Sequence, residues 1–524
     1  MKRFGEPAPM QTSRGRGGWR VTTPLVLLTL VAPVCIDGPD ASPPPDAATA
    51  APVRKSAFDP RRPPERELEI GVADGFTLAA VGDCIISRPH VPMLARDTAF
   101  AAVVKILREA DVAFGNFEDT AIDLQGFKGS PHPWLGDWTL IAPPEVAVDL
   151  KTLGFDLLAH ANNHTLDWGV EGMLETDRHL DEVGLVHAGT GGDRGAARAA
   201  RYLETGRGRV GLVSMASTFP EFAEALAPRG GAPGRPGLNA LRTKRLTIVP
   251  AGTMRDLARL AGILGPAKDC PTPDALPSET PDPRATSVPP DQAPAELDLF
   301  GEHFQLGQRA GYHYEIDPID LQENLRSIRL GTQHSDLLLA TIHAHEEALG
   351  CGLPADFLRE LAHAAIDAGA GAFLGHGIHH LGPIEIYKGR PIFYGLGNFF
   401  WGDIQQPLPG NLFEQYRDLL AGALGDPDRA TDADLTALLN ARDFKQDRVF
   451  QTIVAVTRYD RGRASEIRLY PVDLGYGMRL TRSGVPRMAS PQTARVILER
   501  LQRLSEPYGT TIRIEDSVGV IRPG

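Results

Sequence analysis

The stretch that decides the fold is FTLAAVGD, residues 76–83, in which an apolar run leads through a glycine into an aspartate. Six uncharged residues bounded by a glycine are typical of a strand that is buried on both faces. An aliphatic residue would be expected at the end of such a strand in a packed core. Asp83 therefore predicts either a turn at the strand end or a ligand in a functional site.

Similar apolar runs recur along the chain and predict further strands at residues 111–114, 155–159, 210–215, 336–342, 371–374, 384–387, 392–394 and 450–456. Between several of them, apolar residues spaced by three and four predict helices over residues 98–109, 144–153, 170–183 and 354–368. Glycines follow three of these helices, as is common where helices end. The alternation of strands and helices predicts an α/β fold.

Polar and ionisable residues follow five of the predicted strands. They are Asp83, Asn116 with Glu118, residues 160–164, His343 with His345, and His376 with His379. In open α/β sheets, binding sites form outside the carboxyl ends of the strands. We therefore expect these side chains to converge and to form a metal site.

Divalent metal ions would give such a site a hydrolytic chemistry. Water is a poor nucleophile at neutral pH, and a bound divalent ion lowers its pKa towards about 7. Carboxylate, amide and imidazole groups are ligands of zinc, manganese and iron. In the motif Asn162-Asn163-His164, an amide ligand brings no charge, and the adjacent imidazole can act as a general acid.

Five motifs follow one another along the chain. They are AVGDCIISR (residues 80–88), GNFED (115–119), ANNHTLDWG (161–169), TIHAHEE (341–347) and GHGIHHLGPIEIYKGRPIFYGLGNFF (375–400). In this order they resemble the CapA, or poly-γ-glutamate capsule synthesis, family, a branch of the calcineurin-like metallophosphoesterase superfamily. The resemblance covers about residues 74–402 and extends to LYPVDLG at residues 469–475.

The resemblance implies an α/β four-layer αββα sandwich of the metallophosphoesterase type, with a Pro/Gly-rich insertion and one or two divalent metal ions (manganese, zinc or iron). The implied metal ligands are Asp83, Glu118, Asn163, His343, His376 and His379, and the implied catalytic imidazole is His164. The chain departs from the superfamily at Ile85, which stands where a histidine is usual. Two residues instead of one also separate His376 from His379. A strict two-metal mechanism is therefore left open.

Further residues are expected to contact an anionic substrate, namely Arg88, Asn116, His345, Arg235 and Arg242. Arg88 could hold a carboxylate or phosphate through two hydrogen bonds, or it could form a salt bridge within the fold. Arg235 and Arg242 lie in a stretch rich in Gly and Pro, where we see no packing role for positive charge. For Asn162–His164 the alternative is capping of the next helix, because Asn is a favoured N-cap residue.

The composition of the chain indicates how it is divided. Residues 1–36 carry arginines before a short apolar run and predict a signal peptide or N-terminal leader, since the run is too short to span a membrane. Residues 37–73 predict a disordered linker, and residues 265–295 a flexible insertion within a domain at 74–480. Residues 481–524 are expected to form a C-terminal extension that packs on this domain.

The leader predicts an exported protein of the periplasm or cell envelope, with membrane association through the N-terminus. Cys35 resembles a lipoprotein acceptor cysteine, but Val34 stands where a small residue is usual, so a lipid anchor is the less favoured alternative. The net charge of −12 argues against nucleic acid as a partner, because a phosphate-backbone binder needs an excess of basic residues.

The ligand set favours an exported metal-dependent hydrolase that acts on a phosphoester or on an amide-linked anionic polymer, and the family resemblance implies a role in poly-γ-glutamate capsule biosynthesis. The alternative is a non-catalytic component of capsule assembly that binds the polymer and holds a structural metal. Either protein would have the capsule synthesis machinery as its partner. A cytoplasmic tailoring role would follow if residues 1–36 are not an export signal.

Overall fold

The computed structural model describes residues 67–132, 138–264, 293–348, 353–402, 407–443 and 447–523. The expected leader, Cys35, most of the expected linker and residues 265–292 of the expected insertion lie outside the described residues. Within the described part of the chain, no helix is both long enough and apolar enough to cross a membrane.

The first of two central sheets has ten strands and joins the two ends of the described chain. In spatial order they are β21 (Arg513–Glu515), β22 (Val518–Ile521), β19 (Arg463–Asp473), β18 (Gln451–Asp460), β1 (Phe76–Ile85), β2 (Val112–Phe117), β3 (Leu157–Ala159) and β4 (Val186–Ala188), with β17 (Asn398–Trp401) beside β1 and β20 (Arg487–Met488) beside β19. The strands from β1 to β4 are parallel, so their carboxyl ends lie at one edge.

The second central sheet has six strands. In spatial order they are β15 (Ile384–Tyr387), β16 (Arg390–Phe393), β14 (Ala372–His376), β13 (Leu337–His343), β7 (Gly208–Ala216) and β6 (Arg201–Thr205). The strands β7, β13, β14 and β16 are parallel. Their carboxyl ends therefore also share one edge.

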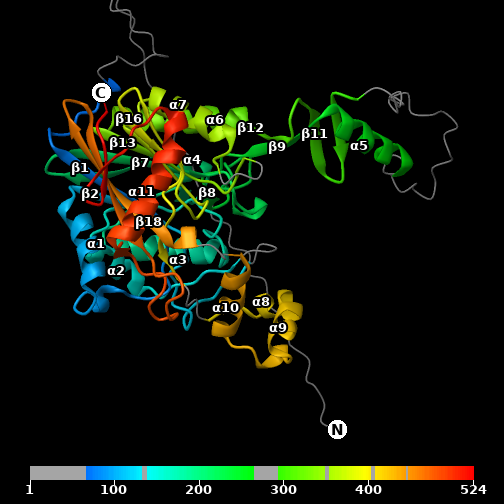
Figure 1. Cartoon of the computed structure of the whole chain (residues 1–524), viewed down its shortest axis with the longest axis horizontal. Helices are drawn as coiled ribbons and strands as arrows, with labels where there is room; N and C mark the ends of the chain where they lie inside the picture. The colour runs from blue at the N-terminus through cyan, green and yellow to red at the C-terminus, as the bar shows by residue number, and fades with distance from the viewer. Residues whose placement is uncertain are drawn as a thin grey trace, which may run out of the picture. The chain divides into compact units, whose positions relative to one another are not determined.

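The two sheets pack face to face and are covered on their outer faces by helices, which confirms the expected four-layer αββα sandwich. Alternate residues of the strands face opposite layers: Leu78 of β1 and Leu339 of β13 belong to the core between the sheets, while their neighbours Ala79 and Leu338 belong to the outer cores. The outer layer of the first sheet contains α1 (Thr98–Glu109), α2 (Glu145–Leu153) and α3 (Gly169–Glu182), and that of the second contains α6 (Pro318–Gln333) and α7 (Asp356–Asp367). Figure 1 shows α1 and α2 on one side of the strands and α6 and α7 on the other.

Smaller elements complete the described chain. The strands β9 (Thr243–Val249), β10 (Glu296–Leu299), β11 (Glu302–Leu306) and β12 (Gly311–Ile316) form a four-stranded sheet, and β5 (Thr190–Gly191) pairs with β8 (Gly237–Leu238). The other helices are α4 (Arg194–Arg198), α5 (Ala251–Leu264), α8 (Gly410–Gln415), α9 (Arg417–Leu424), α10 (Asp432–Asp443) and α11 (Pro491–Ser505), with short 3-10 turns η2 (Val91–Met93), η3 (Glu221–Ala223), η4 (Pro427–Arg429), η5 (Asp447–Phe450) and η6 (Glu506–Tyr508). Within residues 481–524, α11 packs Ile497 and Leu501 into the core between the sheets.

Four of the strands that carry the polar motifs, β1, β2, β13 and β14, extend further towards their carboxyl ends than their apolar runs predicted. β1 continues to Ile85, so Asp83 lies inside the strand, where it pairs with Asn116 of β2 and Asn398 of β17. His343 and His376 are likewise paired in register at the ends of β13 and β14. The backbone ladders continue through these polar residues because the neighbouring strands supply hydrogen-bond partners whatever the side chain.

Candidate metal centre

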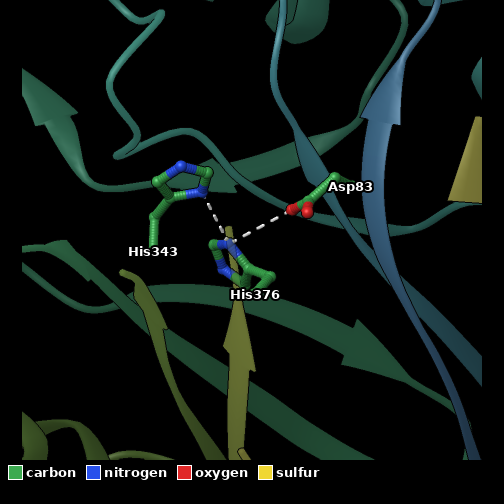
Figure 2. A group of neighbouring side chains, drawn as sticks. All are labelled: Asp83, His343 and His376. Carbon is green, nitrogen blue, oxygen red and sulfur yellow. Dashed lines mark hydrogen bonds and ion pairs between the residues drawn. The ribbon is translucent and has the colours of Figure 1, made fainter. Parts of the chain in front are cut away.

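Acidic and imidazole side chains from both central sheets meet where the parallel strands end. Asp83 comes from β1 of the first sheet, and His343 and His376 come from β13 and β14 of the second. Figure 2 shows the His376 ring between the other two side chains, with its Nδ1 3.6 Å from Asp83 Oδ1 and 3.0 Å from His343 Nδ1. All three side chains are buried, so the site lies below the protein surface.

Glu118 and two further histidines extend this group. One ligand atom each from Glu118, His343 and His345 lie within 4.8 Å of one another, and the same holds for Asp83, Glu118 and His379. Glu118 Oε1 is 3.5 Å from His343 Nε2, and His345 Nε2 is 2.9 Å from the same nitrogen. His345, expected to contact substrate, therefore lies among the candidate metal ligands.

Thr341 sets the orientation of the His376 ring. Its hydroxyl donates to the backbone carbonyl of Leu374 at 2.8 Å, and its Oγ1 is 2.7 Å from His376 Nε2. Because the hydroxyl proton is already engaged, Oγ1 must accept from His376 Nε2–H. The lone pair of Nδ1 is then directed towards Asp83, which is the tautomer that a metal ligand needs.

The loop after β14 is bent so that its backbone and His379 both reach Asp83. The backbone N–H of Gly377, at φ 107°, donates to Asp83 Oδ2 at 3.1 Å. His379 has φ 56°, a left-handed conformation that is uncommon for a residue other than glycine. Its Nδ1 is 2.9 Å from Asn398 Oδ1 and 3.5 Å from Asp83 Oδ2. Such strain persists where surrounding contacts hold it, and it often marks a functional site.

Asn116 orients an acidic ligand, whereas the sequence predicted a substrate contact. Its side chain is fully buried, and its Nδ2 donates to Asp83 Oδ1 at 2.8 Å. Its Oδ1 accepts a hydrogen bond from Asn162 Nδ2 at 3.3 Å. β2 pairs with β1 in register at this point, which leaves the amide between two neighbouring strands and away from solvent.

His164 is held by a carboxylate on one side and faces Glu118 on the other. Its Nδ1 is 2.8 Å from Asp167 Oδ2, and its Nε2 is 4.0 Å from Glu118 Oε1. The backbone N–H of Leu140 also donates to Asp167 Oδ2, at 2.6 Å. A histidine that donates Nδ1–H to a fixed carboxylate has its Nε2 available for proton transfer.

The alternative that residues 162–164 cap the next helix is wrong. The N-cap residue of α3 is Trp168, and no side chain caps this helix. Asn162 Oδ1 instead accepts from the backbone N–H of His164 at 3.1 Å, which closes a tight turn. Asn163 is buried within this turn, between the residue that binds Asn116 and the residue that faces Glu118.

Burial and neighbouring groups set the protonation of the centre. Burial lowers the pKa of His376 to about 4, against the opposing effect of Asp83. Burial and then the neighbouring imidazoles lower the pKa of His343 well below its ordinary value. Burial alone would raise the pKa of Asp83, but hydrogen bonding to His379 and the nearby imidazoles lower it. At neutral pH these groups are therefore a carboxylate and neutral rings, as a bound cation requires.

Two arginines that were expected to contact substrate are paired within the fold. Arg242 Nε and Nη2 donate to Asp320 at 2.6 and 3.1 Å, and Arg235 Nε and Nη2 donate to the Glu224 carbonyl at 3.1 and 2.6 Å. The side chain of Asp320 is fully buried. Both arginines therefore have hydrogen-bond partners within the fold that the linear sequence does not reveal, and a substrate role for them stays a prediction.

An open cleft of about 530 Å³ reaches the centre at His345, and its lining includes Thr218 and Arg245. Arg88 lines a different cleft, and its Nη2 donates to the Thr481 carbonyl at 2.7 Å. The structure thus favours the structural alternative for Arg88.

Sequence reasoning did not identify Thr341 as part of the site. The available signal was a single hydroxyl residue inside the apolar run before His343. Asn398, in the last of the five motifs, contacts His379 directly. Both roles depend on which strands become neighbours.

Comparisons with known proteins agree with this geometry. The family model described as bacterial capsule synthesis protein PGA_cap matches residues 77–402, which include every candidate ligand described above. The chain is 43% identical over 467 residues to the uncharacterized protein y4sH of Sinorhizobium fredii, which covers 86% of this chain and 94% of the relative. It is 23% identical over 330 residues to the capsule biosynthesis protein CapA of Bacillus anthracis, covering 62% of this chain and 59% of that protein.

A probable polyglutamine synthesis accessory protein of Mycobacterium tuberculosis is 26% identical over 256 residues, which are 49% of this chain and 47% of that protein. The matched region runs from β1 to β17 and so contains both parallel strand edges. The order of motifs, the fold and the family model agree: the chain belongs to the PGA_cap family of bacterial capsule synthesis proteins, within the metallophosphoesterase superfamily.

Proposed function

We propose that this protein is a metal-dependent hydrolase that acts on a phosphoester or an amide-linked anionic polymer in the biosynthesis of a capsule such as poly-γ-glutamate. The observation that carries the proposal is the meeting of Asp83, Glu118, His343 and His376 from the strand ends of two sheets, beside the His164–Asp167 pair. A purely structural ion would not need an oriented imidazole next to its ligands.

The donors fit one or two manganese, zinc or iron ions. Carboxylate oxygens and imidazole nitrogens are suitable for all three metals, and the tautomer of His376 already directs a lone pair at the centre. Asp83, Glu118, His343, His345, His376 and His379 would hold the ions, with Asn163 as the amide ligand that the family resemblance implies. When bound, such ions lower the pKa of water and neutralise developing negative charge.

In this proposal His164 protonates the leaving group. Asp167 accepts from Nδ1–H and stabilises the imidazolium, so that the proton at Nε2 is the one transferred. The backbone N–H of Leu140 keeps Asp167 in the orientation that this requires. Replacement of Asp167 by Asn would leave the shape of the site but weaken this effect.

The names of the relatives support the substrate class. Two of the matched proteins carry names that refer to capsule biosynthesis and to polyglutamine synthesis. The open cleft at His345 would admit a chain end or an internal segment of an extended polymer. We also propose that the protein is exported, because a capsule polymer is assembled at the cell surface.

A second function, non-catalytic polymer assembly with a structural metal, is favoured by one observation. Ile85, where the superfamily usually has a metal-binding histidine, is buried in the apolar core beside α1. One metal position therefore lacks a ligand from β1. Turnover distinguishes the two functions, since a structural ion would bind without supporting hydrolysis.

The test uses the purified full chain, loaded with Mn²⁺ or Zn²⁺ and assayed on p-nitrophenyl phosphates and on poly-γ-glutamate. We expect turnover of one of these substrates, loss of turnover and of the metal at the candidate metal centre in His376→Ala, and loss of turnover with retained metal in His164→Gln. His334→Gln is the matched control, because His334 is an exposed histidine that contacts the Leu330 carbonyl. Metal-loaded protein without turnover on either substrate would favour the assembly function.

A further inference from the structure

A second group of metal-ligating side chains lies apart from the candidate metal centre, between the strand ends of β3 and β4 and the helix α3. It consists of His160 directly after β3, His187 in β4 and Asp177 in α3, with one ligand atom from each within 4.8 Å of the others. Both histidines are buried, and 16% of the Asp177 side chain is exposed. We propose that this group binds one further divalent cation of the zinc class, independently of the candidate metal centre.

The surroundings of His187 are the main reason for this proposal. Its Nε2 is 3.2 Å from Asp181 Oδ1 and its Nδ1 is 3.4 Å from Asp177 Oδ1, so both ring nitrogens face carboxylate oxygens. A neutral imidazole carries one N–H and one lone pair. Whichever nitrogen is protonated, the other directs its lone pair at a carboxylate.

The hydrogen bonds decide which nitrogen has the lone pair. His187 Nε2 and Asp181 meet hydrogen-bond geometry, whereas the buried Nδ1 has no hydrogen-bond partner among the described residues. The neutral ring therefore donates to Asp181 and points its Nδ1 lone pair at Asp177. A cation between Nδ1 and Asp177 turns this repulsion into coordination, while a doubly protonated ring would place a positive charge on a buried group.

The His187–Asp177 distance matches that around a small cation, and the His160–Asp177 distance is at hydrogen-bond length. His160 Nδ1 is 2.9 Å from Asp177 Oδ1, and His187 Nδ1 is 3.4 Å from the same oxygen. A tetrahedral zinc ion with bonds of about 2.0–2.1 Å separates its ligand atoms by roughly 3.3 Å. Two imidazoles and a carboxylate then leave one position for water or for the hydroxyl of Thr190, which lies 2.9 Å from Asp177 Oδ1.

Asp181 provides the outer contact that is usual at such sites. A ligating histidine almost always donates its other ring N–H to a carboxylate, a carbonyl or water, which fixes the ring and raises its basicity. Asp181 occupies this position for His187, and 74% of its side chain is exposed. Of the three ligating side chains, Asp177 is the one that solvent reaches, while the imidazoles remain buried.

The ion would brace the segment that carries the candidate catalytic residues. His160 lies immediately before residues 161–165, and its backbone carbonyl accepts from the Thr165 hydroxyl at 2.8 Å. Asp177 and Asp181 come from α3, which follows the same segment. A cation bound by His160 and Asp177 would hold this segment at both ends and so fix the position of His164. Because the cation would not touch a substrate, its role is structural.

The test is a count of bound zinc in the full chain. After removal of metal with a chelator, the protein is equilibrated with Zn²⁺ and freed of excess, and zinc per chain is measured by elemental analysis. The double variant His160→Gln/His187→Gln should hold one zinc fewer than the wild type. His376→Ala should lose zinc from the candidate metal centre and keep this one, so failure of this proposal and failure of the proposed function give different results.

A milder variant and a matched control complete the test. Asp181→Asn changes an exposed side chain and should raise the dissociation constant of one zinc about 10–100-fold. His179→Gln changes a histidine of α3 that lies outside this group, beside Arg178 and Glu175, and should leave zinc unchanged. Equal zinc content in the wild type and a folded double variant would overturn the proposal. If the double variant does not fold, an unchanged dissociation constant in Asp181→Asn overturns it.

Discussion

The hydroxyl of Thr341 should control metal affinity although Thr341 is not itself a ligand. Its Oγ1 accepts from His376 Nε2–H at 2.7 Å while its proton is donated to Leu374. Thr341→Val keeps the branched shape of the side chain but removes the acceptor, so His376 is free to adopt the other tautomer. Loss of such an outer contact typically weakens metal binding about 10–100-fold, or roughly 1.4–2.8 kcal/mol.

The same substitution leaves a buried donor without its acceptor. In metal-free protein this should cost about 1–3 kcal/mol of unfolding free energy, because His376 is buried and its Nε2–H loses the Thr341 acceptor. The expected result is thus a weaker site in a protein that still folds. Thr341→Ser keeps the hydroxyl and should restore most of the affinity, with only the cost of a lost methyl group.

Calorimetric titration of metal-free protein with Mn²⁺ or Zn²⁺ measures the affinity, and His376→Ala shows which binding remains outside the candidate metal centre. Urea unfolding in the presence of a chelator separately measures the free energy of unfolding of the metal-free protein. If Thr341→Val binds metal within twofold of the wild type, the tautomer argument is refuted. An equal loss of metal affinity in Thr341→Ser and Thr341→Val would also contradict the argument, since the weaker binding would then come from altered packing and not from the lost hydroxyl.

Three further predictions concern the fold. Burial lowers the pKa of His90 to about 3, so the stability contributed by its neutral form is complete above about pH 6.5 and falls as the pH drops towards 3. His90→Leu should therefore reduce the slope of unfolding free energy against pH by up to about 1.4 kcal/mol per pH unit in this range. Unchanged slopes in urea unfolding at a series of pH values would contradict this. Asp320→Ala should cost about 3–5 kcal/mol in urea unfolding, because it leaves the buried Arg198 without its carboxylate and also breaks a half-exposed pair with Arg242. A cost below about 1 kcal/mol would count against it. Gly82→Ala would place a Cβ 1.7 Å from the Gly397 carbonyl oxygen, so its Tm should fall sharply, and a wild-type Tm would show that β17 can move aside.

Strands and helices with strong local patterns could be predicted from the sequence. The helix expected at residues 98–109 is α1 with the same bounds, and the runs at 336–342 and 371–374 became β13 and β14. The four-stranded sheet from β9 to β12 was not expected. Its strands are half exposed and mix charged with apolar residues, so neither a buried run nor a clean alternation is visible in them.

The candidate site was predictable in its residue types but not in all its contacts. Asp83, Glu118, His343, His376 and His379 were expected to be ligands, and they do come within reach of one another in space. The roles of other residues required the register between strands. Asn116 illustrates this, because its amide reaches Asp83 only through the pairing of β1 with β2.

The linear chain by itself determined the alternation of strands and helices, the order of motifs and the set of groups that could bind a cation. These properties depend on local periodicity and on the chemistry of individual side chains. Tertiary structure alone decided which nitrogen of His376 faces the centre, and that the charge of Arg242 is neutralised by Asp320. The physical reason is that tautomers and ion pairs depend on contacts over a few ångströms between residues that are far apart in sequence.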